Sequence, residues 1–398
     1  MPYSSRQRTS ARRRTTHYAA TPASRRKNTK ENIHPSRFIQ AARPATVVAY
    51  TPLHGFADFD VNPLLQRNLV IAGFTIPTPI QDQSIPHGLN GRDIVGIANT
   101  GTGKTLAFAL PLLNKLMHDR NARALIMAPT RELAQQIQEE CKMLARGSGL
   151  SGALLIGGSA MGPQLNDLKY NPQIVIGTPG RIKDHLERNS LKLDNFSVIV
   201  LDEVDRMMDM GFLPDMRHIL GRIPDARQSY FYSATMNSKI QSLILSFSAD
   251  PVTVSVKTGE TSDNVEQNII FAPTDKKLDH LHDLLITDGV SKTLIFHETK
   301  RSVERLSKDL ESRGFAVDAL HGGKTQGQRQ RALDRFKRSE ITVLVATDVA
   351  ARGLDVADIS HVINYTQPQS YEDYVHRIGR AGRAGRTGQA VTFVDRPI

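Results

Sequence analysis

The sequence predicts an α/β protein built from two tandem domains, each a mostly parallel β-sheet flanked by helices. From about residue 51 onward, short β-branched and apolar runs alternate with amphipathic helical stretches, which is typical of parallel sheets covered by helices. The polar run KTGETSDN at 257–264 interrupts this alternation and is the best candidate for a linker. The flanking ranges, 51–256 and 265–398, both have ordinary domain lengths.

The individual elements follow from the local pattern. In the range 299–314, Val303, Leu306 and Leu310 recur at helical spacing and Gly314 supplies a stop, so this range predicts a helix. The predicted strands are Asp93–Ile97, Ala124–Ala128, Ile174–Ile176, Ser197–Leu201, Ser229–Tyr232, Thr293–Phe296, Thr342–Val345 and Ala390–Val394.

Basic charge is concentrated at the N-terminus. The chain has 51 Lys and Arg against 40 Asp and Glu, a formal charge of +11 at pH 7. Residues 1–50 contain eleven of these bases and one acid, Glu31, so they carry 11 − 1 = +10 of that charge. This range is rich in Ser, Thr, Ala and Pro, and we expect it to be a disordered basic tail. Its apolar cluster of Ile33, Phe38 and Ile39 either docks on a folded domain or has no role.

A tail of this charge favours a tether to nucleic acid through phosphate contacts that release counterions. A solubilising leader without a specific partner is one alternative. An organellar transit peptide is another, although residues 1–30 lack the Leu, Ile and Phe that its apolar face needs.

The sequence disfavours disulfide-bonded, zinc-binding, membrane-spanning and secreted proteins. The single cysteine, Cys141, cannot form an internal disulfide or a cysteine zinc cluster, and the 13 histidines show no metal-binding spacing, so we expect no zinc site. No stretch approaches the roughly 18 uninterrupted apolar residues of a spanning helix, and the N-terminus has no apolar signal region. We therefore expect a protein of the reducing cytoplasm without a membrane partner. We also expect a monomer.

A phosphate-binding loop stands between a predicted strand and a helix that runs toward Leu116. Its glycines allow backbone N–H groups to approach phosphate oxygens, and the helix N-terminus adds positive potential. Lys104 is expected to reach the terminal phosphates and the Thr105 hydroxyl to hold Mg²⁺. The first position is an alanine where the general pattern has glycine. The loop is the run Ala98, Asn99, Thr100, Gly101, Thr102, Gly103, Lys104 and Thr105.

Two acidic residues complete this pattern. The predicted strand 197–201 delivers Asp202 and Glu203 at its carboxyl end, where ligands gather in open α/β sheets. Asp202 is expected to bind the metal, through water, and Glu203 to orient or deprotonate an attacking water. A solvated acidic turn is the alternative, which the phosphate loop upstream disfavours. Loop and acids together predict a Mg²⁺-dependent nucleoside triphosphatase.

With these residues in place, the chain resembles the DEAD-box family of ATP-dependent RNA helicases, superfamily 2 enzymes with two RecA-like domains. The resemblance covers about residues 56–394 and consists of many ordered motifs. Asp202-Glu203-Val204-Asp205 resembles the motif that names the family, with Val204 where alanine is usual. The resemblance implies ATP as the nucleotide and RNA as the partner.

Further motifs imply roles at the nucleotide. The run from Pro77 to Gln81 resembles the Q motif, which implies that Gln81 hydrogen-bonds the adenine edge. Phe56 stands at the spacing of the aromatic residue that covers the adenine face, with Phe59 as a close rival. Asp355, in the run Arg352-Gly353-Leu354-Asp355, is implied at the ribose.

The resemblance also implies how the two domains communicate. Ser233 and Thr235 resemble the motif that links the ATP state to the RNA state, through Asp205 and His376. The run from His376 to Arg383 resembles the arginine-finger segment. Because Arg377 and Arg380 lie three residues apart, we expect both to point across the cleft at the γ-phosphate. Without the phosphate-loop domain, these arginines would indicate only a solvated basic face.

The residues implied at RNA are glycine, threonine, proline and arginine, with few aromatics in the whole chain (6%) and no tryptophan. Such groups suit phosphate and sugar oxygens rather than base edges, so we expect sequence-independent binding. The residues are Thr130, Arg131, Gly157, Gly158, Thr178, Pro179, Gly180, Arg181, Arg329 and Thr347.

Three functions remain open at this point. The first is an RNA-dependent ATPase that unwinds short duplexes, and the second is an ATP-gated RNA clamp that serves as an assembly platform. The third, DNA unwinding, uses related domains but is disfavoured by the motif set. The resemblance also makes ribonucleoprotein or ribosome-assembly components plausible partners.

Overall fold

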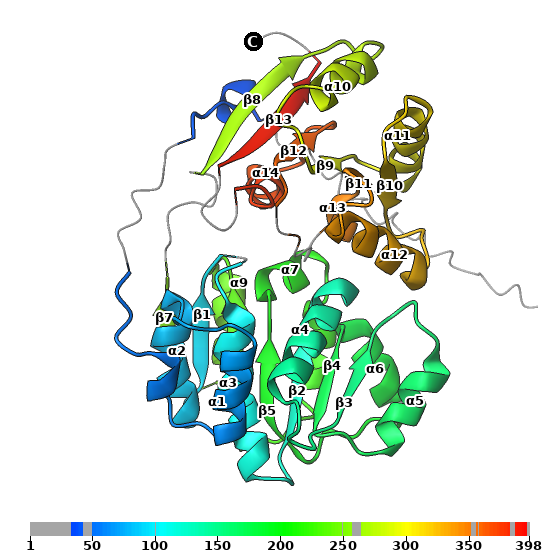
Figure 1. Ribbon diagram of the computed structural model, residues 1–398. Helices are drawn as coiled ribbons and strands as arrows, with labels where there is room; N and C mark the ends of the chain where they lie inside the picture. The colour runs from blue at the N-terminus through cyan, green and yellow to red at the C-terminus, as the bar shows by residue number, and fades with distance from the viewer. Residues whose placement is uncertain are drawn as a thin grey trace, which may run out of the picture.

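The computed structural model describes residues 33–42, 50–99, 101–248, 250–256, 264–351, 356, 358–382 and 387–395. These residues form two α/β domains that lie one above the other (Figure 1). Residues of the predicted linker other than Asn264 lie outside this description, as do Thr100, Asp355 and Arg383.

Domain 1 contains strands and helices in alternation. Its strands are β1 (Ile94–Ile97), β2 (Arg123–Met127), β3 (Gly152–Leu155), β4 (Ile174–Gly177), β5 (Phe196–Leu201), β6 (Gln228–Ser233) and β7 (Val252–Ser255). Its helices are the 3₁₀ turn η2 (Phe56–Asp58), α1 (Pro63–Ile71), α2 (Pro79–Leu89), α3 (Lys104–His118), α4 (Arg131–Leu144), α5 (Met161–Lys169), α6 (Pro179–Glu187), α7 (Val204–Asp209), α8 (Leu213–Leu220) and α9 (Ser238–Leu245).

Domain 2 repeats the pattern with a smaller sheet. Its strands are β8 (Val265–Phe271), β9 (Thr293–Phe296), β10 (Val317–Leu320), β11 (Val343–Ala346), β12 (His361–Asn364) and β13 (Gly388–Val394). Its helices are α10 (Lys277–Leu285), α11 (Lys300–Ser312), α12 (Gln326–Lys337), α13 (Asp348–Ala351) and α14 (Tyr371–Ile378).

Both sheets are parallel. Among the described residues the strand order is β3-β4-β2-β5-β6-β1-β7 in domain 1 and β10-β11-β9-β12-β13-β8 in domain 2, with a parallel register at every pair. The predicted fold class is confirmed. The predicted strands correspond to β1, β2, β4, β5, β6, β9, β11 and β13, and the predicted helix at 299–314 is α11.

The parallel topology places the functional motifs together. The phosphate loop follows β1, Asp202 follows β5, and Ser233 ends β6, so all three lie at the carboxyl edge of the domain 1 sheet. Helix α7, which follows Glu203, faces domain 2 across the boundary between the domains (Figure 1). In domain 2, Thr347 follows β11 at the corresponding edge.

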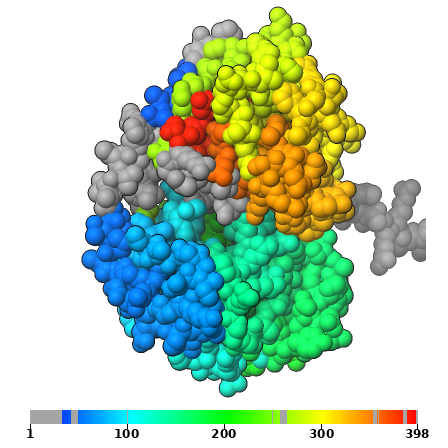
Figure 2. Space-filling model, in the orientation of Figure 1, coloured from blue at the N-terminus to red at the C-terminus, as the bar shows by residue number. Residues whose placement is uncertain are grey.

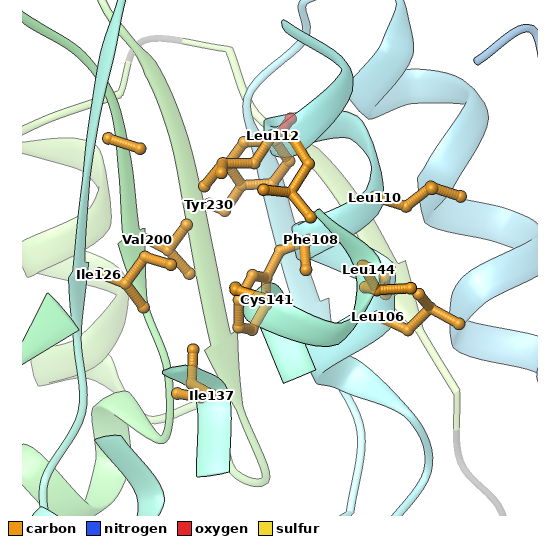
Figure 3. Close-up of a cluster of buried hydrophobic side chains, with 14 of the residues drawn as sticks. Leu106, Phe108, Leu110, Leu112, Ile126, Ile137, Cys141, Leu144, Val200 and Tyr230 are labelled. Carbon is orange, nitrogen blue, oxygen red and sulfur yellow. The ribbon is translucent and has the colours of Figure 1, made fainter. Parts of the chain in front are cut away.

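A tightly packed core fixes α3 and α4 on the domain 1 sheet. Side chains of α3, including Phe108, meet Ile137 and Cys141 of α4 and Val200 of β5 (Figure 3). Cys141 is 3% exposed, and burial, together with the charge of Glu140, raises the pKa of its thiol to about 12. A neutral, buried thiol is a packing residue, as expected for a lone cysteine in a helix.

The N-terminal range departs from expectation. A disordered tail over 1–50 is wrong for residues 33–42, which form the 3₁₀ turn η1 (Pro35–Phe38) and lie on domain 2. Phe38 is fully buried there, and Gln40 pairs with Gln267 of β8. The physical reason is the apolar cluster, because burying the Phe38 ring offsets the entropy of ordering a short segment. Residues 1–32 and 43–49 lie outside the described residues.

In the part of the chain that the structure describes, none of the helices is long and apolar enough to cross a lipid bilayer. In the same part, no three His, Cys, Asp or Glu side chains gather in an arrangement that would hold a metal ion.

Candidate nucleotide and RNA site

The phosphate loop has the conformation that its sequence requires. Gly101 and Gly103 have φ of 83° and 89°, in the left-handed region that favours glycine. Lys104 begins α3, is 6% exposed, and donates from Nζ to the carbonyl of Ala98 at 3.0 Å. Its ammonium thus lies within the loop, where terminal phosphates would bind.

Gln81 contacts the loop directly. Its Oε1 accepts from the Thr78 amide at 2.9 Å, and its Nε2 donates to the carbonyl of Gly103 at 3.0 Å. Thr78 adds a hydrogen bond from Oγ1 to the Thr102 carbonyl at 2.7 Å. A Cβ on Gly103 would lie 2.3 Å from Gln81 Nε2, so this position also needs glycine for space. The Q motif therefore fixes the shape of the phosphate loop, and the adenine contact of Gln81 stays a prediction.

Phe56 is part of the core of domain 1. It is 5% exposed, and its ring centroid lies 6.0 Å from those of both Phe59 and Phe74. The expected stacking of this ring on adenine requires an exposed face, and in this structure the ring is packed against protein instead.

Asp202 and Glu203 stand at the end of β5 as predicted. Asp202 is buried, and this desolvation raises the pKa of its carboxyl to about 6, although the charge of Lys104 opposes the shift. Glu203 has φ 52°, an unfavourable backbone conformation of the kind that clusters at functional sites. Its Oε2 lies 3.3 Å from Nη1 of Arg206, and both residues are buried.

Asp205 connects this strand end to the next one. Its Oδ2 accepts from the Ala234 and Thr235 amides at 3.0 and 2.9 Å and from the Thr235 hydroxyl at 3.2 Å. Ser233 donates to the Thr235 carbonyl at 2.7 Å. Burial opposes ionisation of Asp205, but Lys104 and these hydrogen bonds lower the pKa of its carboxyl. The acidic motif and the Ser233–Thr235 motif thus form one hydrogen-bonded unit.

Val204, the departure from the family pattern, points into the hydrophobic core. It is fully buried in the cluster that includes Met207 and Ile240, away from the two carboxylates. The extra methyl groups therefore act through packing.

We expect Val204→Ala to destabilise domain 1 by about 1–3 kcal/mol, because it leaves a cavity in the core. Denaturant unfolding measures this change. ATP turnover of the folded variant is expected to stay within about twofold of the wild type, since no catalytic atom moves. A large loss of turnover without loss of stability would place Val204 in the chemistry.

Arg377 does not point across the cleft, contrary to the prediction. Its guanidinium binds both oxygens of Asp348, at 2.6 and 2.8 Å, and donates to Asn364 Oδ1 at 3.0 Å and the Thr366 carbonyl at 2.8 Å. It is 3% exposed and lies 5.1 Å from the ring centroid of Phe296. The reason is that domain 2 supplies a planar carboxylate that suits the guanidinium fork better than a more distant partner. Arg377 ties α13 to α14.

Arg380 and His376 lie at the boundary between the domains. They line a narrow gap of about 10 Å³ together with Asp348, Asp373 and the paired Arg377 of domain 2 and Arg206 of domain 1. Arg206 directly follows Asp205, so His376 lies near the end of the acidic motif, and its coupling role stays a prediction. The structure thereby brings the end of α14 to the catalytic strand ends.

The predicted RNA residues meet in one cleft of about 450 Å³ between the domains. In Figure 2, the orange surface of domain 2 rests against the green surface of domain 1 on this side. The cleft is lined by Pro129, Thr130, Arg131, Glu132, Gly157, Thr178, Gly180, Arg181, Met210, Phe212, Gly322, Arg329 and Val349. Gly158 and Pro179 lie next to these residues in the chain, and Thr347 lies two residues before Val349, but none of the three lines the cleft.

Three arginines make this cleft positive. Burial and the nearby charges of Arg329 and Arg181 lower the pKa of Arg131. A Cβ on Gly158 would lie 2.0 Å from Arg131 Nη1, so the glycine makes room for this guanidinium. Three arginines against one lining acid, Glu132, leave a surplus of positive charge that favours binding of an anionic backbone.

Arg329 has a partner that the sequence did not indicate. Its Nη2 lies 2.8 Å from Oε1 of Glu132 in domain 1, and it is 7% exposed. Gln326 donates to Gln135 Oε1 at 3.0 Å on the same side. The expected RNA contact of Arg329 is therefore combined with an interdomain ion pair.

Sequence reasoning missed Arg206 and assigned no separate role to Glu132 or Asp348. Arg206 directly follows the acidic motif, and Glu132 directly follows Arg131, so both lie next to residues that the sequence singled out. Their contacts join segments far apart in the chain, and no local pattern indicates such pairs.

The architecture defines the class of protein. A phosphate loop in one α/β domain, arginines of the second domain at the same boundary, and a positive cleft between them are the parts of a two-domain helicase ATPase. Residues 78–243 match the DEAD/DEAH box helicase family, and residues 276–385 match the helicase conserved C-terminal domain.

Known proteins support this class. The ATP-dependent RNA helicase CshA of Listeria monocytogenes is 45% identical over 341 residues, which are 85% of this chain and 66% of the relative. The DEAD-box ATP-dependent RNA helicase CshA of Bacillus subtilis is 43% identical over 341 residues, with 85% and 69% covered. The chain thus spans about two thirds of the length of these relatives. The chain belongs to the DEAD-box family of ATP-dependent RNA helicases.

Solved structures show the same fold. Dbp5 of S. cerevisiae bound to RNA and ADP BeF3 matches with a TM-score of 0.77 at 29% identity, covering 86% of this chain and 90% of that one. A DEAD box protein from the hyperthermophile Methanococcus jannaschii matches with a TM-score of 0.51 at 38% identity, covering 86% and 93%.

Proposed function

We propose that this protein uses ATP binding and hydrolysis to grip RNA in a sequence-independent way and to unwind short duplexes locally. The observation that carries this proposal is the cleft between the domains, which both domains line and which the Arg329–Glu132 ion pair crosses. Because the cleft is complete only when the domains meet, a ligand that brings them together also completes the RNA site.

ATP is such a ligand. The phosphate loop lies at the same sheet edge as the acidic motif, and Arg380 lines a gap with Arg206, which follows that motif, so ATP bound to the loop is expected to contact both domains and to favour their closed arrangement.

Mg²⁺ fits the residues present at the phosphates. The Thr105 hydroxyl and the Asp202 carboxylate are oxygen ligands, which Mg²⁺ prefers. When bound, Mg²⁺ would neutralise phosphate charge. Glu203 then orients the attacking water, Lys104 stabilises the terminal phosphates, and Arg380 completes the site on closure. The Asp205–Thr235 unit links these groups to the interdomain boundary.

A short RNA duplex with a single-stranded tail tests the proposal. We expect RNA to stimulate ATP turnover and ATP to separate the strands. RNA-stimulated turnover without separation would establish the ATP-gated clamp instead, and turnover that ignores RNA would overturn both. Competition with DNA of the same sequence tests the third function, and RNA is expected to win because its 2′-OH groups offer further contacts.

The basic tail is proposed to add a salt-dependent tether. Because residues 33–42 belong to domain 2, the deletion has to stop at residue 32. Residues 1–32 contain nine of the basic residues, so their removal is expected to flatten the salt dependence of RNA affinity while sparing ATP turnover at saturating RNA. RNA affinity is measured between about 50 and 200 mM salt, and an unchanged slope would contradict the tether.

Cellular setting and assembly are proposed from the sequence. A chain with one buried cysteine suits the reducing cytoplasm, and we propose that it acts there as a monomer, on ribonucleoprotein or ribosome-assembly substrates. Crosslinking in cells followed by identification of the bound RNA tests this setting.

A further inference from the structure

The docked N-terminal segment makes specific contacts with domain 2. The Phe38 ring lies 4.7 Å from that of Tyr374 of α14, and the Arg37 guanidinium lies 3.8 Å above the Tyr371 ring. Gln40 exchanges two backbone hydrogen bonds with Gln267 of β8, at 3.0 and 2.7 Å. Because β8 is an edge strand, this pairing covers its open side.

A few residues after this segment, residues 50–54 are anchored on domain 1. Asp82 of α2, adjacent to Gln81, accepts from the Tyr50 hydroxyl, from the Leu53 amide at 2.8 Å and from the His54 amide at 3.1 Å. The His54 ring adds a contact at 2.7 Å from Nδ1 to Oδ1. Asp82 is 2% exposed, so one buried carboxylate holds the whole segment in front of η2.

These two anchors lie beside the two edge strands that the linker joins in the chain. The linker joins β7, an edge strand of domain 1, to β8, an edge strand of domain 2. The anchor on domain 2 lies on β8, and α2 of domain 1 packs against β7. Figure 1 shows η1 beside β8 and α2 beside β7 on one side of the molecule, while α4 and α12 lie toward the other side.

From this geometry we propose that residues 33–42 and 50–55, here called the strap, form a second covalent connection that limits how far the two domains separate. Eight peptide units join Ala42 to Tyr50, so the anchors stay within about 28 Å of each other while both are bound. One connection allows domain 2 to rotate in any direction. Two connections along one edge leave mainly a hinge motion, which opens and closes the RNA cleft at the opposite edge.

The strap also supports α14, the helix that contains Arg377 and ends just before Arg380. The Tyr374 hydroxyl donates to Gln267 Oε1 at 2.9 Å, so Phe38, Tyr374 and Gln267 form one packed unit beneath α14. His376 and Arg377 follow Tyr374 within the next three residues of α14. A domain held near the closed arrangement loses less freedom when ATP binds, so the strap raises the affinity for ATP and RNA together. This effect rests on the proposed function, whereas the limit on domain separation does not.

Phe38→Ala tests the strap, with Ile39→Ala as the matched control, because Ile39 is its neighbour and is 50% exposed. Dyes on Lys169→Cys of α5 and Lys308→Cys of α11, both exposed residues, report the interdomain distance by single-molecule FRET without nucleotide or RNA. The native Cys141 is buried and does not compete for label. Amide exchange of Gln267 reports docking separately.

We expect Phe38→Ala to accelerate Gln267 exchange at least tenfold and to shift the distance distribution to longer, broader values, while Ile39→Ala matches the wild type. Deletion of residues 1–42, compared with deletion of 1–32, is expected to give the same shift. An unchanged distance distribution would overturn the proposal, even with faster exchange. Because neither readout needs ATP hydrolysis, failure of the strap is distinguishable from failure of the helicase function.

Discussion

Replacement of Lys104 by alanine is expected to abolish ATP turnover, by about a thousandfold or more. In the structure its ammonium lies inside the phosphate loop, 3.0 Å from the Ala98 carbonyl. Its charge also acts on the Asp202 and Asp205 carboxyls, where it opposes the pKa rise caused by burial. Alanine leaves a phosphate site without its cation and two buried acids without the positive charge that most lowers their pKa.

Steady-state turnover at saturating RNA measures this effect, and Lys142→Ala is the matched control. Lys142 is an exposed lysine on α4, and its removal is expected to leave turnover within about twofold of the wild type. Turnover that is unchanged in Lys104→Ala would remove the ATP site from this loop.

The second large effect is a difference between Arg377 and Arg380, which we expect to have different roles. Arg380→Ala is expected to slow hydrolysis by about a thousandfold while leaving ATP affinity within a few fold, since its charge acts where the γ-phosphate is transferred. Arg377→Ala is expected to destabilise domain 2 by roughly 2–4 kcal/mol, because it strips Asp348 and Asn364 of their shared partner.

Three measurements distinguish these outcomes: denaturant unfolding, binding of a fluorescent ATP analogue, and single-turnover hydrolysis. Arg377→Lys retains the charge but not the bidentate geometry, so it is expected to recover only part of the lost stability. An Arg377→Ala variant with wild-type stability and no hydrolysis would reverse the two roles.

Much of the fold was predictable because interior strands carry strong local signals. The strands β1, β2, β4, β5 and β6 are apolar runs flanked by sheet on both sides. The strands that were missed are mostly at sheet edges, where β3, β7, β8 and β10 each have a single neighbouring strand and less apolar character. The exception, β12, is interior but contains His361 and Asn364, and Asn364 is buried because Thr392 and Arg377 satisfy its amide.

The site was predictable to the extent that its chemistry is local. The phosphate loop and the Asp202–Asp205 run depend on neighbours in sequence, and both have the predicted position. The Asp205–Thr235 contact was implied by family resemblance and is present. Three other site residues could not be placed in this way, because each has a partner that is distant in the sequence. Arg377 binds Asp348, Arg329 pairs with Glu132, and Gln81 donates to the carbonyl of Gly103. The motifs in the sequence identify the arginines of the site. They do not show which of these arginines forms an ion pair within the protein.

The central claim is that ATP and RNA act on one equilibrium between open and closed domains. Thermodynamic linkage then requires that each ligand raise the affinity for the other by the same factor. The most direct measurement is the dissociation constant of a short single-stranded RNA with and without a non-hydrolysable ATP analogue, together with that of the analogue with and without RNA. We predict that both constants fall, by one common factor of about ten or more. RNA affinity that is the same with and without the analogue would contradict the account.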